Sequence, residues 1–245
     1  MLSIDLDGRR ALVTGASGGI GAGIVAVLRE AGAEVVAHYR SDAAGAADAA
    51  GDAALTVHAE LDAPGAAAAL LDAAGPFDII VHNAADQQLA PLAGSDTAVW
   101  ERVLGANVTA AAELTRHAAR RWIDGGRPGA VVAISSIEGL QPAPEHGVYA
   151  ASKAALAMWV RAAAGEYGRH GIRVNAVSPG LVGRPGLGDA WPEGVARWHA
   201  AAPLARLGTP ADIGRAVAFL ASDLAAWITG ANLVVDGGVL CRPTW

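Results

Sequence analysis

TGASGGIG, residues 14–21, is the stretch that most narrows the choice of fold. It follows a short apolar run, 11–14, typical of a buried strand, and precedes apolar residues at helical spacing that end at Gly32. A helix that begins in a glycine-rich turn offers unpaired N–H groups and its positive dipole end to a pyrophosphate. Glycines also allow the backbone to approach such a ligand closely. The spacing is G-x-x-x-G-x-G, so a plain tight turn between strand and helix is the alternative.

Further short apolar runs alternate with helical segments along the rest of the chain. The predicted strands are 11–14, 34–37, 55–58, 77–82, 129–135, 172–177 and 232–235, and the predicted helices include 43–50, 63–74, 98–123 and 148–167. Continuous apolar strands alternating with helices imply an α/β fold with a parallel sheet covered on both faces. No linker or change of composition interrupts the pattern, which predicts one domain over residues 1–245.

Composition excludes several classes of function. The 245 residues are 53% apolar and 17% charged, which favours a packed core over disorder. No apolar run approaches the roughly 20 residues of a membrane span, and residues 1–10 lack a signal-peptide pattern. With one cysteine, Cys241, no internal disulfide can form, and a cytoplasmic location is expected. A net charge of −6 without a basic stripe argues against nucleic acid, and seven scattered histidines argue against a metal site.

YAASK, residues 149–153, is the second informative stretch. It places Tyr149 and Lys153 one turn apart on a face of the predicted helix 148–167. A free phenol titrates near ~10. A fixed ammonium nearby lowers that pKa, which suits a general acid for a ketone or a general base for an alcohol. Taken alone, such a pair more often shares a helix face by chance.

The order of these features resembles the short-chain dehydrogenase/reductase family. The resemblance rests on residues 14–21, Ser136, Tyr149 and Lys153, and it covers essentially the whole chain. It also includes HNAA at 82–85, Asn107, RVNAVSPG at 173–180, ITG at 228–230 and VDGG at 235–238. The resemblance implies a single-domain Rossmann fold with a doubly wound parallel sheet of about seven strands, helices on both faces, bound NAD(H) or NADP(H), and a homotetramer.

The resemblance also implies a role for each residue of the site. Tyr149 would exchange the proton with the substrate oxygen, and Ser136 would hydrogen-bond the substrate carbonyl. Lys153 would lower the pKa of Tyr149 and bond the nicotinamide ribose, while Asn107 would support a water-linked proton relay. The implied cofactor contacts are Gly15, Ser17, Gly18, Gly19, Ile20, Gly21, Tyr39, Arg40, Ser41, Asp62, Asn83, Ala84, Tyr149, Lys153, Pro179, Gly180 and Val182. For Asp62 the alternative is a helix cap.

The end of the second predicted strand favours NADP(H) over NAD(H). An NAD-preferring site usually has an acidic residue there to hold the ribose hydroxyls, and this chain has Tyr39, Arg40 and Ser41 instead. Arg40 and the Ser41 hydroxyl suit a 2′-phosphate. The alternative is that Arg40 is a solvated surface charge. Gly18 stands where many NADP-dependent members carry a second basic residue.

The substrate is expected to be a small-molecule ketone or secondary alcohol whose identity lies in a lid over about 180–202. Residues 180–194 read as a long glycine-rich loop, and Trp191 and Trp198 either line an apolar pocket or pack the lid on the domain. His146 either faces this pocket or is a surface or packing residue. A 3-oxoacyl-carrier-protein reductase is a specific alternative, for which Arg127 stands at a fitting position. Two further alternatives to the reductase use the same fold. One is a non-catalytic dinucleotide sensor, and the other is an epimerase or dehydratase. The apolar C-terminal segment 228–245 is expected to take part in a subunit interface.

Overall fold

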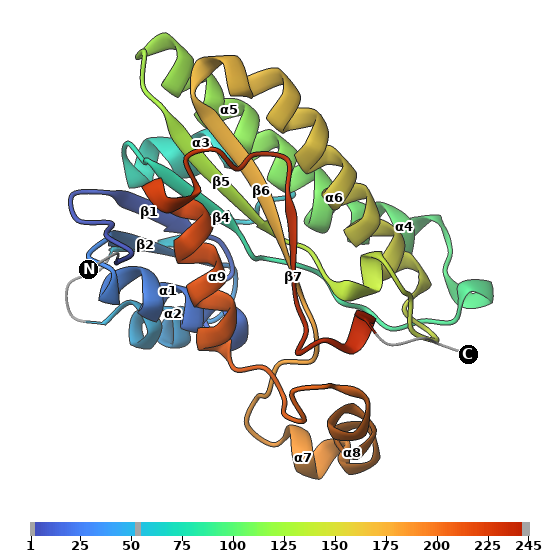
Figure 1. The fold of residues 1–245 in the computed structure, drawn as a ribbon. Coiled ribbons are helices and arrows are strands. Elements are labelled where there is room, and N and C mark those ends of the chain that lie inside the picture. The colour runs from blue at the N-terminus through green and yellow to red at the C-terminus, as the bar shows by residue number, and fades with distance from the viewer. Residues whose placement is uncertain (1–2, 52–54, 242–245) are drawn as a thin grey trace.

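The computed structural model describes residues 3–51 and 55–241 (Figure 1). Within these residues one parallel sheet contains strands in the order β3-β2-β1-β4-β5-β6-β7. The strands are β1 (Arg10–Val13), β2 (Glu34–Tyr39), β3 (Leu55–His58), β4 (Ile79–His82), β5 (Gly129–Ile134), β6 (Ile172–Pro179) and β7 (Asn232–Val235). The chain winds outward from β1 first in one direction and then in the other. The predicted doubly wound parallel sheet is therefore confirmed.

The sheet is the centre of the core because its inner strands are apolar on both faces. All residues of β4 and of β5 are buried, as expected for a strand covered on both sides. In the central register, Leu12 pairs with Val36 on one side and with Ile80 on the other. Parallel strands in this register bring their carboxyl ends to one edge, where a doubly wound sheet binds its ligands.

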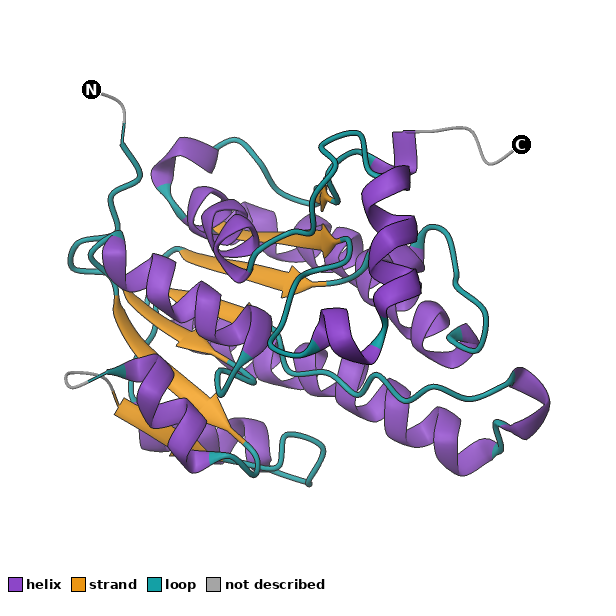
Figure 2. Ribbon diagram, turned by 90° about the horizontal axis from the view of Figure 1, so that it is seen from below, coloured by secondary structure: helices purple, strands orange, loops and turns teal. Residues whose placement is uncertain are grey.

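Helices cover both faces (Figure 1 and Figure 2). They are α1 (Gly19–Glu30), α2 (Ala43–Ala50), α3 (Ala66–Ala74), α4 (Thr97–Leu104), α5 (Ala110–Asp124), α6 (Gly147–Tyr167), α7 (Leu187–Ala190), α8 (Pro192–Ala201) and α9 (Pro210–Ala221). On one face, α1 and α9 contribute Leu28 and Val217 to an apolar cluster. On the other, α3, α5 and α6 contribute Leu70, Leu114 and Leu156 to a second cluster.

Two predicted segments have a different form. The helix predicted over 98–123 is divided by a π-helical turn, Gly105–Thr109, between α4 and α5. Such turns are often found at functional sites. The loop predicted over 180–194 contains α7 and the start of α8. Pro192 occupies the first turn of α8, where its missing N–H costs no hydrogen bond. In Figure 1, α7 and α8 form a small pair outside the two helical layers.

None of the described helices is long and apolar enough to cross a bilayer.

His82, at the end of β4, gives a prediction for acid stability. Its ring is buried against Trp159, Nε2 lies 2.7 Å from the Thr115 hydroxyl, and burial lowers the pKa of His82 to about 3. The unfolded chain therefore takes up the proton first, so stability is full above the unfolded pKa of about 6.5 and is lost as the pH falls towards 3. Each pH unit in this window costs about 1.4 kcal/mol.

His82→Asn should remove this acid sensitivity. Urea unfolding at pH 7 and pH 5 measures it, and His117→Asn on the outer side of α5 is the matched control because its side chain is 29% exposed. An equal loss of stability in the wild type and His82→Asn between these pH values would contradict the assignment.

Candidate functional site

The glycine-rich turn lies between β1 and α1, at the carboxyl edge of the sheet. Gly15 has a φ of +64°, and a Cβ there would lie 2.8 Å from the Ala84 Cα. A Cβ on Gly21 would collide with the Gly15 carbonyl oxygen. A Cβ on Gly18 or Gly19 would meet nothing within 4 Å, so this side of the turn is open. The glycines thus combine close internal packing with a free outer surface.

Several residues from neighbouring strands hold this turn in place. The Thr14 hydroxyl accepts hydrogen bonds from the N–H groups of Asn83 at 3.0 Å and Ala84 at 3.1 Å. The Asn83 amide donates to the Gly15 carbonyl at 2.8 Å. Nδ1 of His38 accepts from the Gly15 N–H at 3.2 Å, and burial lowers the pKa of His38, which keeps it a neutral acceptor. Thr14 begins the stretch singled out in the sequence, whereas His38 was not predicted and is revealed only by the pairing of β1 with β2.

The turn fits a dinucleotide. Gly18 caps α1 without a side-chain hydrogen bond, so the first N–H groups of the helix stay available at the open side of the turn. This is the arrangement that binds a pyrophosphate. At the end of β2, Arg40 and Ser41 are exposed, and Arg40 forms no ion pair with any described residue. Asp62 is exposed too, but α3 is capped by Gly65, so the predicted capping role of Asp62 is wrong.

α6 brings Tyr149 and Lys153 together as predicted. The Lys153 ammonium lies 5.5 Å from the centre of the Tyr149 ring, and the two residues are 2% and 7% exposed, respectively. Ser136 is the second residue after β5 and caps a short 3₁₀ helix, η3 (Ile137–Gly139). Its hydroxyl interacts with Tyr149. The carboxyl end of β5 and the first turns of α6 therefore assemble two hydroxyls and one amine.

The electrostatics of this group differ from the sequence prediction. Burial, reinforced by the charge of Glu138 and opposed by the Ser136 hydrogen bond, raises the pKa of Tyr149 to about 12. Lys153 donates to the Ile134 carbonyl at 2.8 Å, and burial lowers the pKa of Lys153 to about 8. The prediction that Lys153 depresses the pKa of Tyr149 is wrong for the described residues. At neutral pH the phenol is protonated and available as an acid.

Asn107 is placed by the π turn between α4 and α5. It is 2% exposed, and its amide donates to the Asp86 carbonyl and to the Ser152 hydroxyl, both at 2.9 Å. The Ser152 hydroxyl in turn donates to the Tyr149 carbonyl at 2.7 Å. Asn107 thus joins the loop after β4 to α6 and has no direct hydrogen bond to Lys153. Ser152 was not among the predicted site residues, although its place beside Lys153 marks it as part of the same turn.

The lid helices close against the end of β6. A Cβ on Gly180 would lie 2.7 Å from the Trp198 ring, so Trp198 packs where β6 ends. Val182 forms an isolated parallel bridge with Gly208. Trp191 packs on Gly194 within the lid and is 46% exposed. The indole N–H of Trp198 is buried without a partner among the described residues. These contacts favour the packing role for Trp198 and place it beside the predicted cofactor segment.

A pair absent from the sequence prediction borders the Tyr149 group. Nδ1 of His146 lies 2.6 Å from Oε2 of Glu138, and both side chains are 19% exposed. His146 packs beside the reacting groups, because its ring meets that of Tyr149 edge-to-face at a centroid distance of 6.4 Å. Glu138 also borders a pocket of about 510 Å³ between η3, the 140–147 loop and α6.

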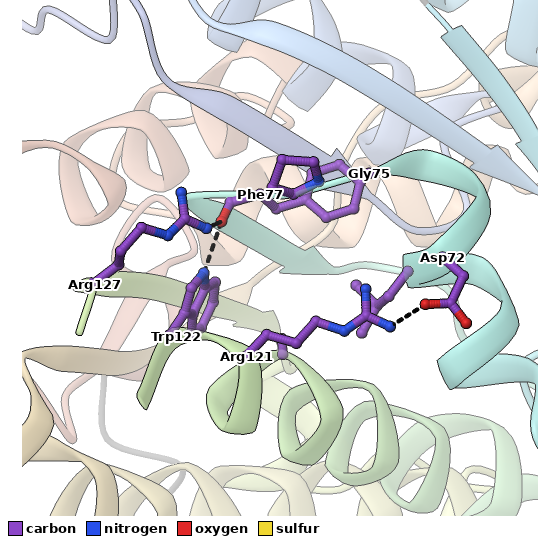
Figure 3. Close-up of a pocket in the computed structure, with 9 residues that line it drawn as sticks. Asp72, Gly75, Phe77, Arg121, Trp122 and Arg127 are labelled. Atoms are coloured by element: carbon purple, nitrogen blue, oxygen red, sulfur yellow. Dashed lines mark hydrogen bonds and ion pairs between the residues drawn. The ribbon is translucent and has the colours of Figure 1, made fainter. Parts of the chain in front are cut away.

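A second pocket, of about 260 Å³, lies at the opposite edge of the sheet (Figure 3). There the Trp122 indole donates to the Phe77 carbonyl at 2.7 Å. Arg127 points to the same carbonyl at 3.4 Å, and Arg121 pairs with Asp72 at 2.5 Å. This pocket precedes β4 and β5, whereas Tyr149 and the glycine turn follow their strands. Its two guanidinium groups are already paired, and it is not part of the site.

No group of three or more His, Cys, Asp or Glu side chains suited to a metal occurs in the described part of the chain.

Comparison with known proteins agrees with this geometry. A family model described as enoyl-(acyl carrier protein) reductase matches residues 15–240. A 3β-hydroxysteroid dehydrogenase of Eggerthella lenta is 37% identical over 98% of this chain and 96% of its own. A cis-4-hydroxycyclohexanecarboxylate dehydrogenase of Sinomonas cyclohexanicum is 40% identical over 94% and 96%.

A solved structure shares the whole architecture. It belongs to a protein from Agrobacterium tumefaciens assigned as a 2-deoxy-D-gluconate 3-dehydrogenase, with NADP bound. The TM-score is 0.89 and the identity 33%, over 98% of this chain and 99% of that one.

Proposed function

The chain belongs to the short-chain dehydrogenase/reductase family, and from this membership we propose that it reduces a ketone with NADPH, or oxidises the matching secondary alcohol with NADP⁺. The observation that carries the proposal is the assembly of the half-buried Ser136 with the buried Tyr149 and Lys153 at the carboxyl edge of the sheet. The edge also contains the open glycine turn suited to a dinucleotide. The relatives are named for oxidation at a ring-bound hydroxyl group, which is the same class of reaction.

Each residue of the assembly has a defined role in this reaction. NADPH bound at the glycine turn would supply a hydride to the carbonyl carbon, and this transfer would place a negative charge on the oxygen. Tyr149 is protonated at neutral pH and donates its proton to that oxygen. Ser136 donates a hydrogen bond to the same oxygen, and such prepositioned donors contribute a few kcal/mol each. Lys153 would bond the nicotinamide ribose and return a proton to Tyr149, and Asn107 holds α6 against the loop after β4.

Consumption of NADPH with a panel of ketones tests this function. Turnover of any ketone separates the enzyme from a non-catalytic dinucleotide sensor on the same fold. An isomerisation or dehydration without net NADPH consumption would indicate the epimerase or dehydratase alternative. Binding of NADPH without turnover across the panel would reject the reductase.

Arg40 supports NADP(H) as the cofactor, because its exposed guanidinium is unpaired among the described residues and stands at the end of β2 beside the glycine turn. Arg40→Ala should weaken NADPH binding by about 10- to 100-fold, the value of a charged hydrogen bond, and leave NADH binding unchanged. Isothermal titration calorimetry with both cofactors measures the ratio. Arg29→Ala, at the far end of α1, is the control. An unchanged ratio in Arg40→Ala would show that Arg40 is a surface charge.

Three further assignments stay predictions. The first is the single domain 1–245 with a lid at 180–202, in the cytoplasm. The second is a homotetramer, which agrees with the exposed Met158 on α6 and the fully exposed Trp227 before β7. Residues 242–245 of the predicted apolar tail lie outside the described residues. The third is a carrier-bound substrate, for which Arg127 offers little because it already contacts the Phe77 carbonyl and lies 3.8 Å from Asp78.

A further inference from the structure

Glu138 and His146 form a hydrogen-bonded pair that is fixed relative to the reacting groups. The Glu138 N–H donates to the Ser136 hydroxyl oxygen at 3.1 Å. The His146 ring meets the Tyr149 ring edge-to-face with centroids 6.4 Å apart. The two side chains join each other at 2.6 Å. The pair is therefore anchored at one end to Ser136 and at the other to Tyr149.

Each partner retains a free hydrogen-bond acceptor. Because the Glu138 carboxylate accepts from Nδ1, the neutral His146 ring has its proton on Nδ1 and an acceptor at Nε2. Neither Nε2 of His146 nor Oε1 of Glu138 bonds to another described residue, and neither belongs to the buried atoms without a partner. With 19% of each side chain exposed, both acceptors are accessible. Two acceptors, one of them anionic, suit a hydroxyl donor and repel a carboxylate or phosphate.

The pocket beside Glu138 is otherwise apolar or lined by small residues. Its walls are Leu92, Leu140 and Pro142 on one side and alanines of α6 on the other, while His146 and Tyr149 lie outside its lining. Two acidic residues, Glu138 and Glu145, line this pocket, and of these two Glu138 forms an ion pair with His146. A few placed polar groups in an apolar wall fix the orientation of a ligand. The charge of Glu138 also has an unfavourable effect here: it raises the pKa of Tyr149 and so disfavours the phenolate.

We propose that Glu138 and His146 bind a hydroxyl group of the substrate close to its reacting carbonyl, so that uncharged hydroxyketones are the preferred substrate class. The inference rests on the proposed ketone reduction and specifies its substrate. In this arrangement Ser136 and Tyr149 hold the carbonyl oxygen, while the pair accepts from the neighbouring hydroxyl. A plain ketone leaves the pair unused, and a keto acid places a negative charge beside Glu138.

Two ketones that differ by one hydroxyl group test the proposal. With NADPH, wild-type kcat/KM should be at least about tenfold higher for 3-hydroxy-2-butanone than for 2-butanone, which corresponds to one hydrogen bond to a charged group. Glu138→Gln removes the charge, and His146→Phe keeps the ring packing on Tyr149 without its nitrogen atoms. Both should reduce this ratio, mainly through the KM of the hydroxyketone. Glu145→Gln removes a charge from the same pocket without touching the pair, and should keep the wild-type ratio.

A pH profile provides a readout that a merely structural role would not change. The titratable groups around Tyr149 are Lys153 on α6, Glu138 on η3 and His146 just before α6. Oxidation of 2-butanol requires the phenolate, and Glu138→Gln should therefore move the rising limb of its rate to lower pH.

The possible failures are distinguishable. If Glu138→Gln and His146→Phe lower kcat/KM equally for both ketones, or if Glu145→Gln lowers the ratio as much as they do, the pair is not a substrate anchor although the reductase remains. If the wild type binds NADPH but reduces neither ketone, the proposed function itself fails and the anchor falls with it.

Discussion

Replacing Tyr149 with phenylalanine should lower kcat for ketone reduction by about 10²- to 10⁴-fold, the contribution of a positioned general acid. The ring of Tyr149 is buried, and phenylalanine fills the same space, so only the hydroxyl is lost. Ser136 still donates to the substrate oxygen, but no group remains to transfer a proton to it. Single-turnover reduction followed at the NADPH absorbance measures the effect on the chemical step.

Cofactor binding separates a chemical effect from a structural one. The Kd for NADPH in Tyr149→Phe should change far less than kcat, because the glycine turn and Arg40 would still bind the phosphates and Tyr149 is only one of many implied cofactor contacts. Tyr167→Phe, at the carboxyl end of the same helix, is the matched control and should keep wild-type turnover. Substantial ketone reduction by Tyr149→Phe at neutral pH would reject Tyr149 as the acid.

The sequence predicts the sheet well because its signal is local. Buried parallel strands are continuous apolar runs, and the strands 55–58 and 232–235 begin and end where they were predicted. The π turn at Gly105–Thr109 leaves no such trace, since its one extra residue per turn does not alter composition. The helices of the 180–202 lid were only partly predicted, because the glycines of this segment weaken the helical pattern in the sequence. They are stabilised by tertiary packing, as of Trp198 on Gly180, which local propensity does not encode.

The same distinction applies to the site. The spacing of Tyr149 and Lys153 within one helix is visible in the sequence, and Ser136 follows from the order of motifs. The raised pKa of Tyr149 cannot be read from the sequence, because it depends on burial and on the nearby charge of Glu138. His38 supports the glycine turn only through the pairing of β1 with β2. The role of a residue that acts through contacts between separate helices and strands can be recognised only once the three-dimensional arrangement of those elements is known.

Lys153→Met should lower kcat by about 10²-fold or more and remove a pH dependence that the wild type shows. Burial lowers the pKa of Lys153 to about 8 and raises that of Tyr149 to about 12. As the pH rises, the ammonium therefore loses its proton before the phenol does. The rate of ketone reduction should be level below pH 8 and fall above it, by up to about tenfold per pH unit, while Tyr149 still has its proton.

This order of titration identifies which group limits the reaction. If Lys153 returns the proton to Tyr149, the fall above pH 8 belongs to Lys153, and Lys153→Met should give a slow but level profile from pH 6 to pH 10. Methionine fills the buried channel without a charge and leaves the Ile134 carbonyl without its donor, so thermal melts must accompany the kinetics. Ser152→Ala keeps Lys153 and should retain the fall above pH 8. A fall near pH 8 that persists in Lys153→Met would assign that proton to another group, because no ammonium would remain beside Tyr149.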